Sequence, residues 1–286
     1  MEIVSTCSEM RKLVLDWRRN SNFSICLVPT MGCFHEGHLS LMRTAREKAD
    51  RMVVSLYVNP TQFSPGEDLE QYPRNMRKDI HLAENEGVHC LFTPDSSEMY
   101  PDGFQTWVEV TKLSKGLCGK SRQDHFRGVA TIVAKLFNIV QPDVAVFGQK
   151  DYQQLQIIRR MVEDLNISVE IVGYPIIREK DGLAMSSRNT YLSQEERKSA
   201  VCLWHAINRA HEMVAAGMDS CSELANHLRE YIKTYPATRI DYIFIGDPDT
   251  LEKKETIEAR TLLAMAVWVG KTRLIDNTIL MGTSQN

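Results

Sequence analysis

Short apolar runs rich in β-branched residues alternate with helix-like patterns through the first part of the chain. The runs occupy 25–28, 51–58, 88–92, 144–147 and 168–176, and helical patterns occupy 38–49, 75–86, 126–140 and 151–165. Strand–helix–strand spacing of this kind is typical of parallel βαβ units, which predicts an α/β fold with a doubly wound, Rossmann-like parallel sheet. Ligands of such sheets bind beyond the carboxyl ends of the strands. The residues that follow the strands are therefore the first candidates for function.

The pattern changes near residue 178, where a polar stretch (REKDGLAMSSRN) has little periodicity. Two helical patterns follow at 193–216 and 220–235, and strand-like runs come at 239–245 and 262–269. Helices followed by strands, without alternation, predict a smaller α+β domain at the C-terminus. We expect the boundary within 177–186 and assign 1–180 and 181–286 to the two domains.

Charge and cysteine content narrow the class of protein. The net charge of −3 over 286 residues gives no support to a general role in binding nucleic acid. Seven cysteines, an odd number with no CxxC pair, argue against a disulfide framework or a cysteine–zinc site and favour a reducing compartment. The charged N-terminal stretch is atypical of a signal peptide, and no apolar run approaches the ~20 residues of a membrane span. We therefore expect a cytoplasmic protein with no membrane partner.

The sharpest local motif is PTMGCFHEGH at 29–38, between a predicted strand and a predicted helix. Gly32 and Gly37 permit close approach of the backbone, and a helix start offers N–H groups to an anion. His35 and His38 bracket that start, where two imidazoles could donate to phosphate oxygens. The motif could instead be half of a zinc site, although no further ligands are evident, or the histidines could be ordinary surface or core residues. A Walker-type GK[ST] sequence does not follow the glycines, which argues against a P-loop.

Three further polar clusters follow predicted strands or join the two domains. FGQKDYQQ at 147–154 places Lys150 where an ammonium would suit a phosphate, or it is a plain helix start capped by Asp151. MSSR at 185–188 offers two hydroxyls and a guanidinium to a phosphate, or it is a solvated hinge. NPTQF at 59–63 presents amides to a substrate hydroxyl or carboxylate, or it is an ordinary turn. A fifth segment, RQDHFRG at 122–128, could add cationic groups or be a helix start of mixed charge.

The ordered set of motifs resembles the pantothenate synthetase family. It comprises PTMG-x-Φ-H-x-G-H (where Φ is apolar), NPTQF, HFRGV, FG-x-KDYQQ, MSSRN, and RLIDN at 273–277. The HxGH sequence alone would indicate only the wider nucleotidyltransferase superfamily, which includes class I aminoacyl-tRNA synthetases. The resemblance covers nearly the whole chain, so it is more specific than any single motif.

The resemblance implies an ATP-dependent ligase of pantothenate biosynthesis, on the route to coenzyme A. The carboxylate of (R)-pantoate attacks the α-phosphate of ATP, giving pantoyl adenylate and pyrophosphate. The amine of β-alanine then attacks the acyl carbon, giving pantothenate and AMP. The resemblance also implies a need for Mg2+, whose ligands it leaves unknown, and a homodimer.

Functional residues carry over from the family by motif. His38 is the expected catalytic histidine, with His35 beside it on the phosphates and Lys150 contributing its charge. Pantoate is expected at Gln62 and Gln154, and Asn59 is included from the same turn as Gln62. The residues expected to bind ATP are Met31, Gly32, Cys33, Phe34, His35, Glu36, Gly37, His38, Gly148, Gln149, Lys150, Asp151, Ile177, Met185, Ser186, Ser187 and Arg188. The segment 185–188 is expected to close over the triphosphate, which makes 181–286 a lid domain.

The sequence departs from the family pattern at a few positions. Gln123 and Asp124 stand where Pro-Gly is usual, and Cys118 stands where an acidic residue is common. Cys33 fills a variable position of the first motif, which predicts sensitivity to thiol reagents. Two rival interpretations stay open: another nucleotidyltransferase, such as a cytidylyltransferase or a class I synthetase, and a nucleotide-binding regulatory module without turnover.

Overall fold

The computed structural model describes residues 1–282, and the chain forms two compact units. The first unit contains Met1–Gln149 and Gln154–Pro175. The second contains Lys150–Gln153 and the chain from Ile176 onward. The short segment that carries Lys150 thus groups with the second unit, although it follows a strand of the first. The division into 1–180 and 181–286 stays a prediction about the domains.

The first unit is built on a six-stranded parallel sheet. In spatial order the strands are β1 (Glu2–Val4), β4 (Cys90–Phe92), β3 (Arg51–Leu56), β2 (Ile25–Thr30), β5 (Val144–Gly148) and β6 (Glu170–Tyr174). The residues from Ile25 to Val28 are all buried, because a central parallel strand is covered on both faces and need not alternate. The predicted doubly wound parallel sheet is confirmed.

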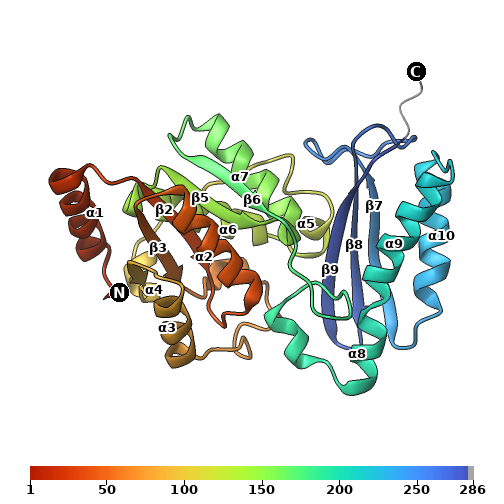
Figure 1. Ribbon diagram of the computed structural model, residues 1–286, viewed down its shortest axis with the longest axis horizontal. Helices are drawn as coiled ribbons and strands as arrows, with labels where there is room; N and C mark the ends of the chain where they lie inside the picture. Colours follow the sequence, from red (N-terminus) through yellow and green to blue (C-terminus); the bar gives the residue numbers. More distant parts are fainter. Residues whose placement is uncertain (283–286) are drawn as a thin grey trace. The chain divides into compact units, whose positions relative to one another are not determined.

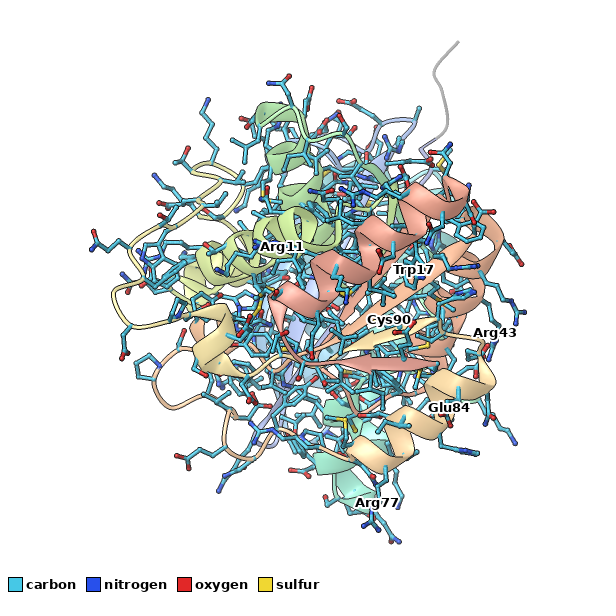
Figure 2. The ribbon with its side chains drawn as sticks, turned by 90° about the vertical axis from the view of Figure 1, so that its left-hand side faces the viewer. Arg11, Trp17, Arg43, Arg77, Glu84 and Cys90 are labelled. Atoms are coloured by element: carbon cyan, nitrogen blue, oxygen red, sulfur yellow. The ribbon has the colours of Figure 1, made fainter. Side chains whose placement is uncertain are left out.

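Helices lie on both faces of this sheet. They are α1 (Cys7–Ser21), α2 (Glu36–Lys48), α3 (Met76–Asn85), α4 (Ser96–Met99), α5 (Cys118–Ser121), α6 (His125–Val140) and α7 (Tyr152–Asp164), with short 3-10 turns η1 (Pro60–Gln62) and η2 (Gln149–Asp151). Figure 2 shows β4, marked by Cys90, between α1 with Trp17 and α3 with Glu84. Helix α6 packs with α1, and α2 packs with α3. Met42 of α2 joins Cys26 of β2 in one apolar cluster.

The strand order reverses beside β2. From β2 the chain proceeds to β3 and then β4 on one side, whereas β5 and β6 lie on the other side. β2 pairs with β3 from Ile25 to Thr30 and with β5 at Cys26 and Leu27. A doubly wound sheet has its binding crevice at such a switch point, beyond the carboxyl ends of the strands. The loop after β2 and the end of β5 flank this point.

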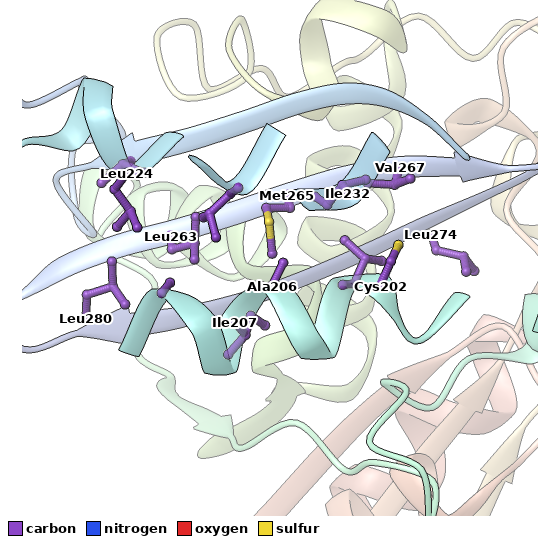
Figure 3. Packing of buried hydrophobic residues seen from close by; sticks show 14 of the residues in the cluster. Cys202, Ala206, Ile207, Leu224, Ile232, Leu263, Met265, Val267, Leu274 and Leu280 are labelled. Atoms are coloured by element: carbon purple, nitrogen blue, oxygen red, sulfur yellow. The ribbon is translucent and has the colours of Figure 1, made fainter. Parts of the chain in front are cut away.

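The second unit combines helices with a three-stranded antiparallel sheet (Figure 1). The strands are β7 (Thr238–Gly246), β8 (Thr261–Val269) and β9 (Thr272–Leu280), and the helices are α8 (Gln194–Ala200), α9 (Cys202–Ala215) and α10 (Cys221–Lys233), with the 3-10 helix η3 (Ser187–Tyr191). Ala206 of α9 and Leu224 of α10 pack on Leu263 and Met265 of β8 (Figure 3). The predicted smaller α+β fold is confirmed.

Several elements differ from the sequence-based expectation. The strand expected at 88–92 begins at Cys90, and the long helix expected at 193–216 is divided near Val201 into α8 and α9. Strand β9, which contains RLIDN, was not predicted, because polar residues interrupt its apolar pattern. Within residues 1–282, none of the helices has both the length and the apolar character that crossing a bilayer requires.

Candidate active site

The loop between β2 and α2 turns through two consecutive left-handed residues. Gly32 has φ +83° and Cys33 has φ 53°, a conformation that glycine adopts freely and other residues rarely adopt. A Cβ atom on Gly32 would lie 3.1 Å from both Asp79 Oδ2 and a methyl of Leu56. The loop is therefore closely packed on α3 and β3, and this packing sets where α2 begins.

The carboxylate of Asp79 fastens this loop from α3. Its Oδ2 accepts the backbone N–H of Cys33 at 2.8 Å, and its Oδ1 accepts that of Phe34 at 2.7 Å. Asp79 is only 1% exposed. These two loop amides are thus already paired, so anion binding at this loop falls to other groups. The sequence analysis missed Asp79, since nothing in its motif distinguishes it from an ordinary acidic residue in the first turn of a helix.

His35 and His38 lie side by side at the start of α2. Their ring centroids are 4.1 Å apart, with an interplanar angle of 33°. His38 Nδ1 accepts the backbone N–H of His35 at 3.4 Å, so a neutral His38 ring carries its proton on Nε2. The positive end of the helix dipole adds to this environment. The pair can therefore present a hydrogen-bond donor to an anion.

The remaining residues of the first motif take different orientations. Phe34 is 2% exposed and packs in the apolar core of the first unit. Glu36 forms an ion pair with Arg43, which also binds Glu86. Met31 is half-buried, and its sulfur accepts a hydrogen bond from Gln62 Nε2 at 3.0 Å. This contact joins the first motif to the NPTQF turn.

The NPTQF turn is held by Asn59, which is 1% exposed. Its Nδ2 donates to Gln62 Oε1 at 3.1 Å and to the carbonyl of Gly128 at 3.2 Å. Its Oδ1 accepts from the Thr61 hydroxyl at 2.9 Å. Asn59 thus orients Gln62 from within the turn. Gln62 itself lies against the weakly accepting sulfur of Met31, which a better acceptor on a substrate would displace at little cost.

The RQDHFRG segment, which leads into α6, supports the same turn. His125 Nδ1 contacts the Gln62 carbonyl oxygen at 2.7 Å, and Arg122 Nη2 donates to that oxygen at 3.3 Å. Arg122 also forms an ion pair with Glu67 at 2.7 Å. A Cβ on Gly128 would lie 2.4 Å from the Thr61 carbonyl oxygen, so only glycine permits this approach. The cationic groups expected in this segment therefore support the turn through its backbone.

The end of β5 brings the next predicted residues to the switch point of the sheet. A Cβ on Gly148 would meet nothing within 4 Å, which leaves its backbone open to a ligand. Gln149 Nε2 donates to the Gly173 carbonyl of β6 at 3.4 Å. Gln154 is half-buried in the first turns of α7. These residues belong to the first unit, as do 31–38 and 59–62.

The other predicted residues belong to the second unit. Lys150 Nζ lies 3.8 Å from Asp151 Oδ2. The carbonyl of Ile177 accepts the N–H of Met185 at 2.9 Å, and Ser186 Oγ accepts the N–H of Arg188 at 3.3 Å. Ser187 begins η3. The sequence-predicted site residues therefore form two groups, one in each unit, and each group is assembled from segments that are distant in the chain.

One residue of the first motif, Cys33, is a thiol. All seven cysteines lie within residues 1–282 and carry free thiols. Burial, and secondarily the charge of Asp79, raises the pKa of the Cys33 thiol. Among residues 1–282 the structure contains no group of three or more His, Cys, Asp or Glu side chains arranged to hold a metal ion. The zinc alternative for His35 and His38 thus gains no support from their surroundings.

Comparison with known proteins agrees with the motifs. The Pantoate-beta-alanine ligase family profile matches residues 2–279. The pantothenate synthetase of Syntrophobacter fumaroxidans is 54% identical over 280 residues, covering 98% of this chain and 99% of that protein. That of Moorella thermoacetica is 51% identical over the same length, again covering 98% of this chain and 99% of its own.

Solved structures give the same result. The crystal structure of pantothenate synthetase from Thermus thermophilus has a TM-score of 0.92 at 44% identity, covering 97% of this chain and 99% of that chain. Pantoate-beta-alanine ligase from Francisella tularensis, crystallised with β,γ-ATP and β-alanine, has a TM-score of 0.75 at 33% identity, covering 98% of this chain and 97% of that chain. The protein therefore belongs to the pantoate-beta-alanine ligase family, as its motifs predict.

Proposed function

We propose that this enzyme condenses (R)-pantoate with β-alanine, converting ATP to AMP and pyrophosphate through a pantoyl-adenylate intermediate. The observation that carries the proposal is the family match over residues 2–279, which includes every motif singled out above. The complex of the Francisella tularensis relative with β,γ-ATP and β-alanine supports two of the three substrates.

An adenylate suits the chemistry of the two substrates. A carboxylate is a poor acyl donor because its leaving group would be oxide, whereas AMP is a good leaving group. Formation of the adenylate brings an anion to a polyphosphate, so cationic and hydrogen-bonding groups must offset the repulsion. The adenylate must also be kept from water until the amine attacks.

His38 is assigned to the phosphoryl transfer step. Its Nδ1 accepts from the His35 backbone, so its Nε2–H is the group that donates to an oxygen of the α-phosphate as negative charge develops there. His35, 4.1 Å away between ring centroids, acts beside it on the phosphates. Lys150 supplies a positive charge to the same triphosphate.

Pantoate is assigned to Gln62 and Gln154. Gln62 is oriented by Asn59 within the turn after β3, so the amide is in place before a substrate arrives. Asn59 is assigned a supporting role in pantoate binding through Gln62. The remaining ATP contacts are those expected from the motifs, namely the loop after β2, the end of β5 and the segment 185–188, with 181–286 acting as a lid.

Mg2+ is proposed to enter as part of the Mg–ATP substrate. Mg2+ in nucleotide sites is commonly bound by substrate phosphates, water and one or two carboxylates, and needs no all-protein cage. This is compatible with the absence, within residues 1–282, of a cluster of three or more potential ligands. We assign no ligand to the ion. A cytoplasmic homodimer completes the proposal, and seven free thiols favour a reducing compartment.

The decisive experiment is exchange of labelled pyrophosphate into ATP with and without (R)-pantoate. The proposal expects pantoate-dependent exchange without β-alanine, and AMP formation at full rate only when β-alanine is added. A cytidylyltransferase would show CTP-dependent transfer to a phosphorylated alcohol, and a regulatory module would bind ATP without releasing pyrophosphate. Either result would overturn the proposal. Sedimentation velocity tests the homodimer.

A further inference from the structure

Two consecutive polar residues are buried in β9, an edge strand of the sheet in the second unit. Asp276 is 1% exposed and Asn277 is 7% exposed. They belong to RLIDN, a motif to which the proposed reaction assigns no role. Buried polar groups destabilise an apolar core unless they are hydrogen-bonded. The hydrogen-bond partners of these two residues therefore show which segments they position.

The alternation of β9 directs the two side chains to opposite faces. Leu274 and Leu280 pack in the apolar cluster under the helices, and Asp276 shares their face. Asn277 lies on the other face, together with Arg273, which pairs with Asp241 of β7. Two neighbouring residues of β9 therefore contact different parts of the second unit, one on each face of the sheet.

Asp276 binds Arg178 through two hydrogen bonds. Arg178 Nη1 donates to Oδ2 at 2.6 Å and Nη2 donates to Oδ1 at 2.9 Å. The guanidinium carbon lies 4.2 Å from the ring centre of Trp204, and Nη1 also donates to the Gly182 carbonyl at 3.0 Å. Arg178 is thereby fixed by a carboxylate, an aromatic face and a carbonyl.

Arg178 lies near the start of the segment that leads to the MSSR motif at 185–188. Arg178 forms an antiparallel bridge with Ala184, and the N–H of Met185 donates to the Ile177 carbonyl at 2.9 Å. Asn189 Nδ2 closes the far end by donating to the Ala184 carbonyl at 3.1 Å. Residues 177–189 thus form a closed loop, and fixing Arg178 fixes the loop.

Asn277 contacts the short segment Lys150–Gln153 through its side chain. Its Nδ2 donates to the backbone carbonyl of Lys150 at 2.9 Å. The backbone N–H of Asn277 donates to Asp276 Oδ1 at 2.8 Å, so the carboxylate that holds Arg178 also orients the strand at Asn277. Burial raises the pKa of Asp276, while Arg178 and then the Lys150 charge act in the opposite direction. Asn277 therefore ties the backbone of Lys150 to the strand that carries Asp276.

We propose that Asp276 and Asn277 are positioning residues that set the spacing between Lys150 and the 177–189 loop, and so shape the triphosphate-binding surface of the second unit. This rests on the proposed function, because that function places Lys150 and 185–188 on the phosphates of ATP. A buried ion pair stabilises a fold less than apolar packing of the same volume. We therefore assign the Asp276–Arg178 pair a role in positioning the loop. A displacement of about 1 Å at a positioning group lowers rates on the order of 100-fold.

The first variant is Asn277→Ala, which removes the side chain that holds the Lys150 carbonyl. Two readouts are compared with the parent: the Kd for Mg–ATP by calorimetry and the kcat and KM values of pyrophosphate exchange. We expect roughly 10- to 100-fold lower kcat/KM for ATP, weaker ATP binding, and an unchanged KM for pantoate. A general loss of structure would affect both substrates.

The second variant addresses the ion pair. Asp276→Asn leaves Arg178 without its buried counter-charge and is at risk of misfolding, so Arg178→Met with Asp276→Leu replaces both partners by apolar groups. We expect this double variant to fold and to show the same selective loss for ATP. The matched control is Asp241→Asn, which breaks the other ion pair of the same motif, at 2.7 Å, away from Lys150 and 177–189. We expect the control to retain parental kinetics.

A double-mutant cycle identifies the group through which Asn277 acts. If it acts through Lys150, Asn277→Ala costs little further in a Lys150→Ala background. Equal losses in both backgrounds, or parental ATP affinity in Asn277→Ala and in the double variant, would overturn the proposal. If the parent shows no pantoate-dependent exchange, the proposed function fails, while the ATP affinities still decide the positioning role.

Discussion

The carboxylate of Asp79 accepts the backbone N–H of Phe34 at 2.7 Å, although 45 positions separate the two residues in the chain. The same carboxylate holds Cys33, so an acidic residue of α3 determines the path of the loop that delivers His35 and His38. The position of the histidine pair therefore depends on Asp79, a residue outside the HxGH motif.

Asp79→Asn should lower adenylate formation by roughly 10- to 100-fold, because one acceptor oxygen becomes an NH2 group facing a backbone N–H. The free energy of unfolding should fall by about 1–3 kcal/mol. Pyrophosphate exchange and urea denaturation measure the two effects. Asp143→Asn is the control, since Asp143 accepts the Ile25 N–H at 2.7 Å at the opposite end of β2. Equal kinetic losses in both variants would contradict the prediction.

His38→Ala should lower the rate of adenylate formation by roughly 10²–10³, because it removes a hydrogen bond that strengthens in the transition state. The fold should be retained, as judged by circular dichroism and melting temperature. The measurement is single-turnover pyrophosphate release with saturating ATP and pantoate. His227→Ala, an exposed histidine of α10, should behave like the parent. A His38→Ala enzyme of near-parental rate would refute the role given to this residue.

Lys150→Ala should also slow adenylate formation, by a similar factor, because the triphosphate loses a positive charge. The loss should be visible at saturating pantoate and should be accompanied by a higher KM for ATP. Initial rates over a matrix of both substrate concentrations separate these effects. Lys198→Ala, an exposed lysine paired with Glu195, provides the comparison. A loss confined to the KM for pantoate would be inconsistent with this assignment.

Cys33 should react slowly with alkylating reagents at neutral pH. Its pKa is raised by burial and by the charge of Asp79, so the thiolate population stays small until the pH exceeds the ordinary range of a thiol. Alkylation of Cys33, followed by mass spectrometry, should accelerate only as the pH rises beyond the ordinary range of a thiol, and Asp79→Asn should accelerate it at any given pH. Fast modification at neutral pH would contradict this. Equal inactivation of the parent and Cys33→Ser would show that another cysteine is responsible.

The fold was largely predictable from sequence because the central strands are buried on both faces. Uninterrupted apolar runs such as Ile25 to Val28 leave few alternatives to a parallel sheet flanked by helices. Strand β9 escaped prediction for the opposite reason. Asp276 and Asn277 break its apolar pattern, and their burial becomes acceptable only through Arg178 and the Lys150 carbonyl, which no local pattern reveals.

The candidate site was predictable where its residues follow strands in compact motifs. His35, His38 and Gln62 could be singled out because each lies just after a strand. Their supports could not, since Asp79 and His125 act from helices that are distant in the chain. Asn59 shows the limit of motif reasoning. Its place in the substrate site stays a prediction, and the motif gave no sign that its amide orients Gln62.

The position of β5 beside β2 has a consequence for synthesis of the chain. β2 is paired with β3 on one side only until Val144–Gly148 has left the ribosome, so its other edge stays open while more than a hundred residues are added. An open, apolar strand edge is a template for pairing with other chains. Translation products that stop short of β5 are therefore expected to aggregate.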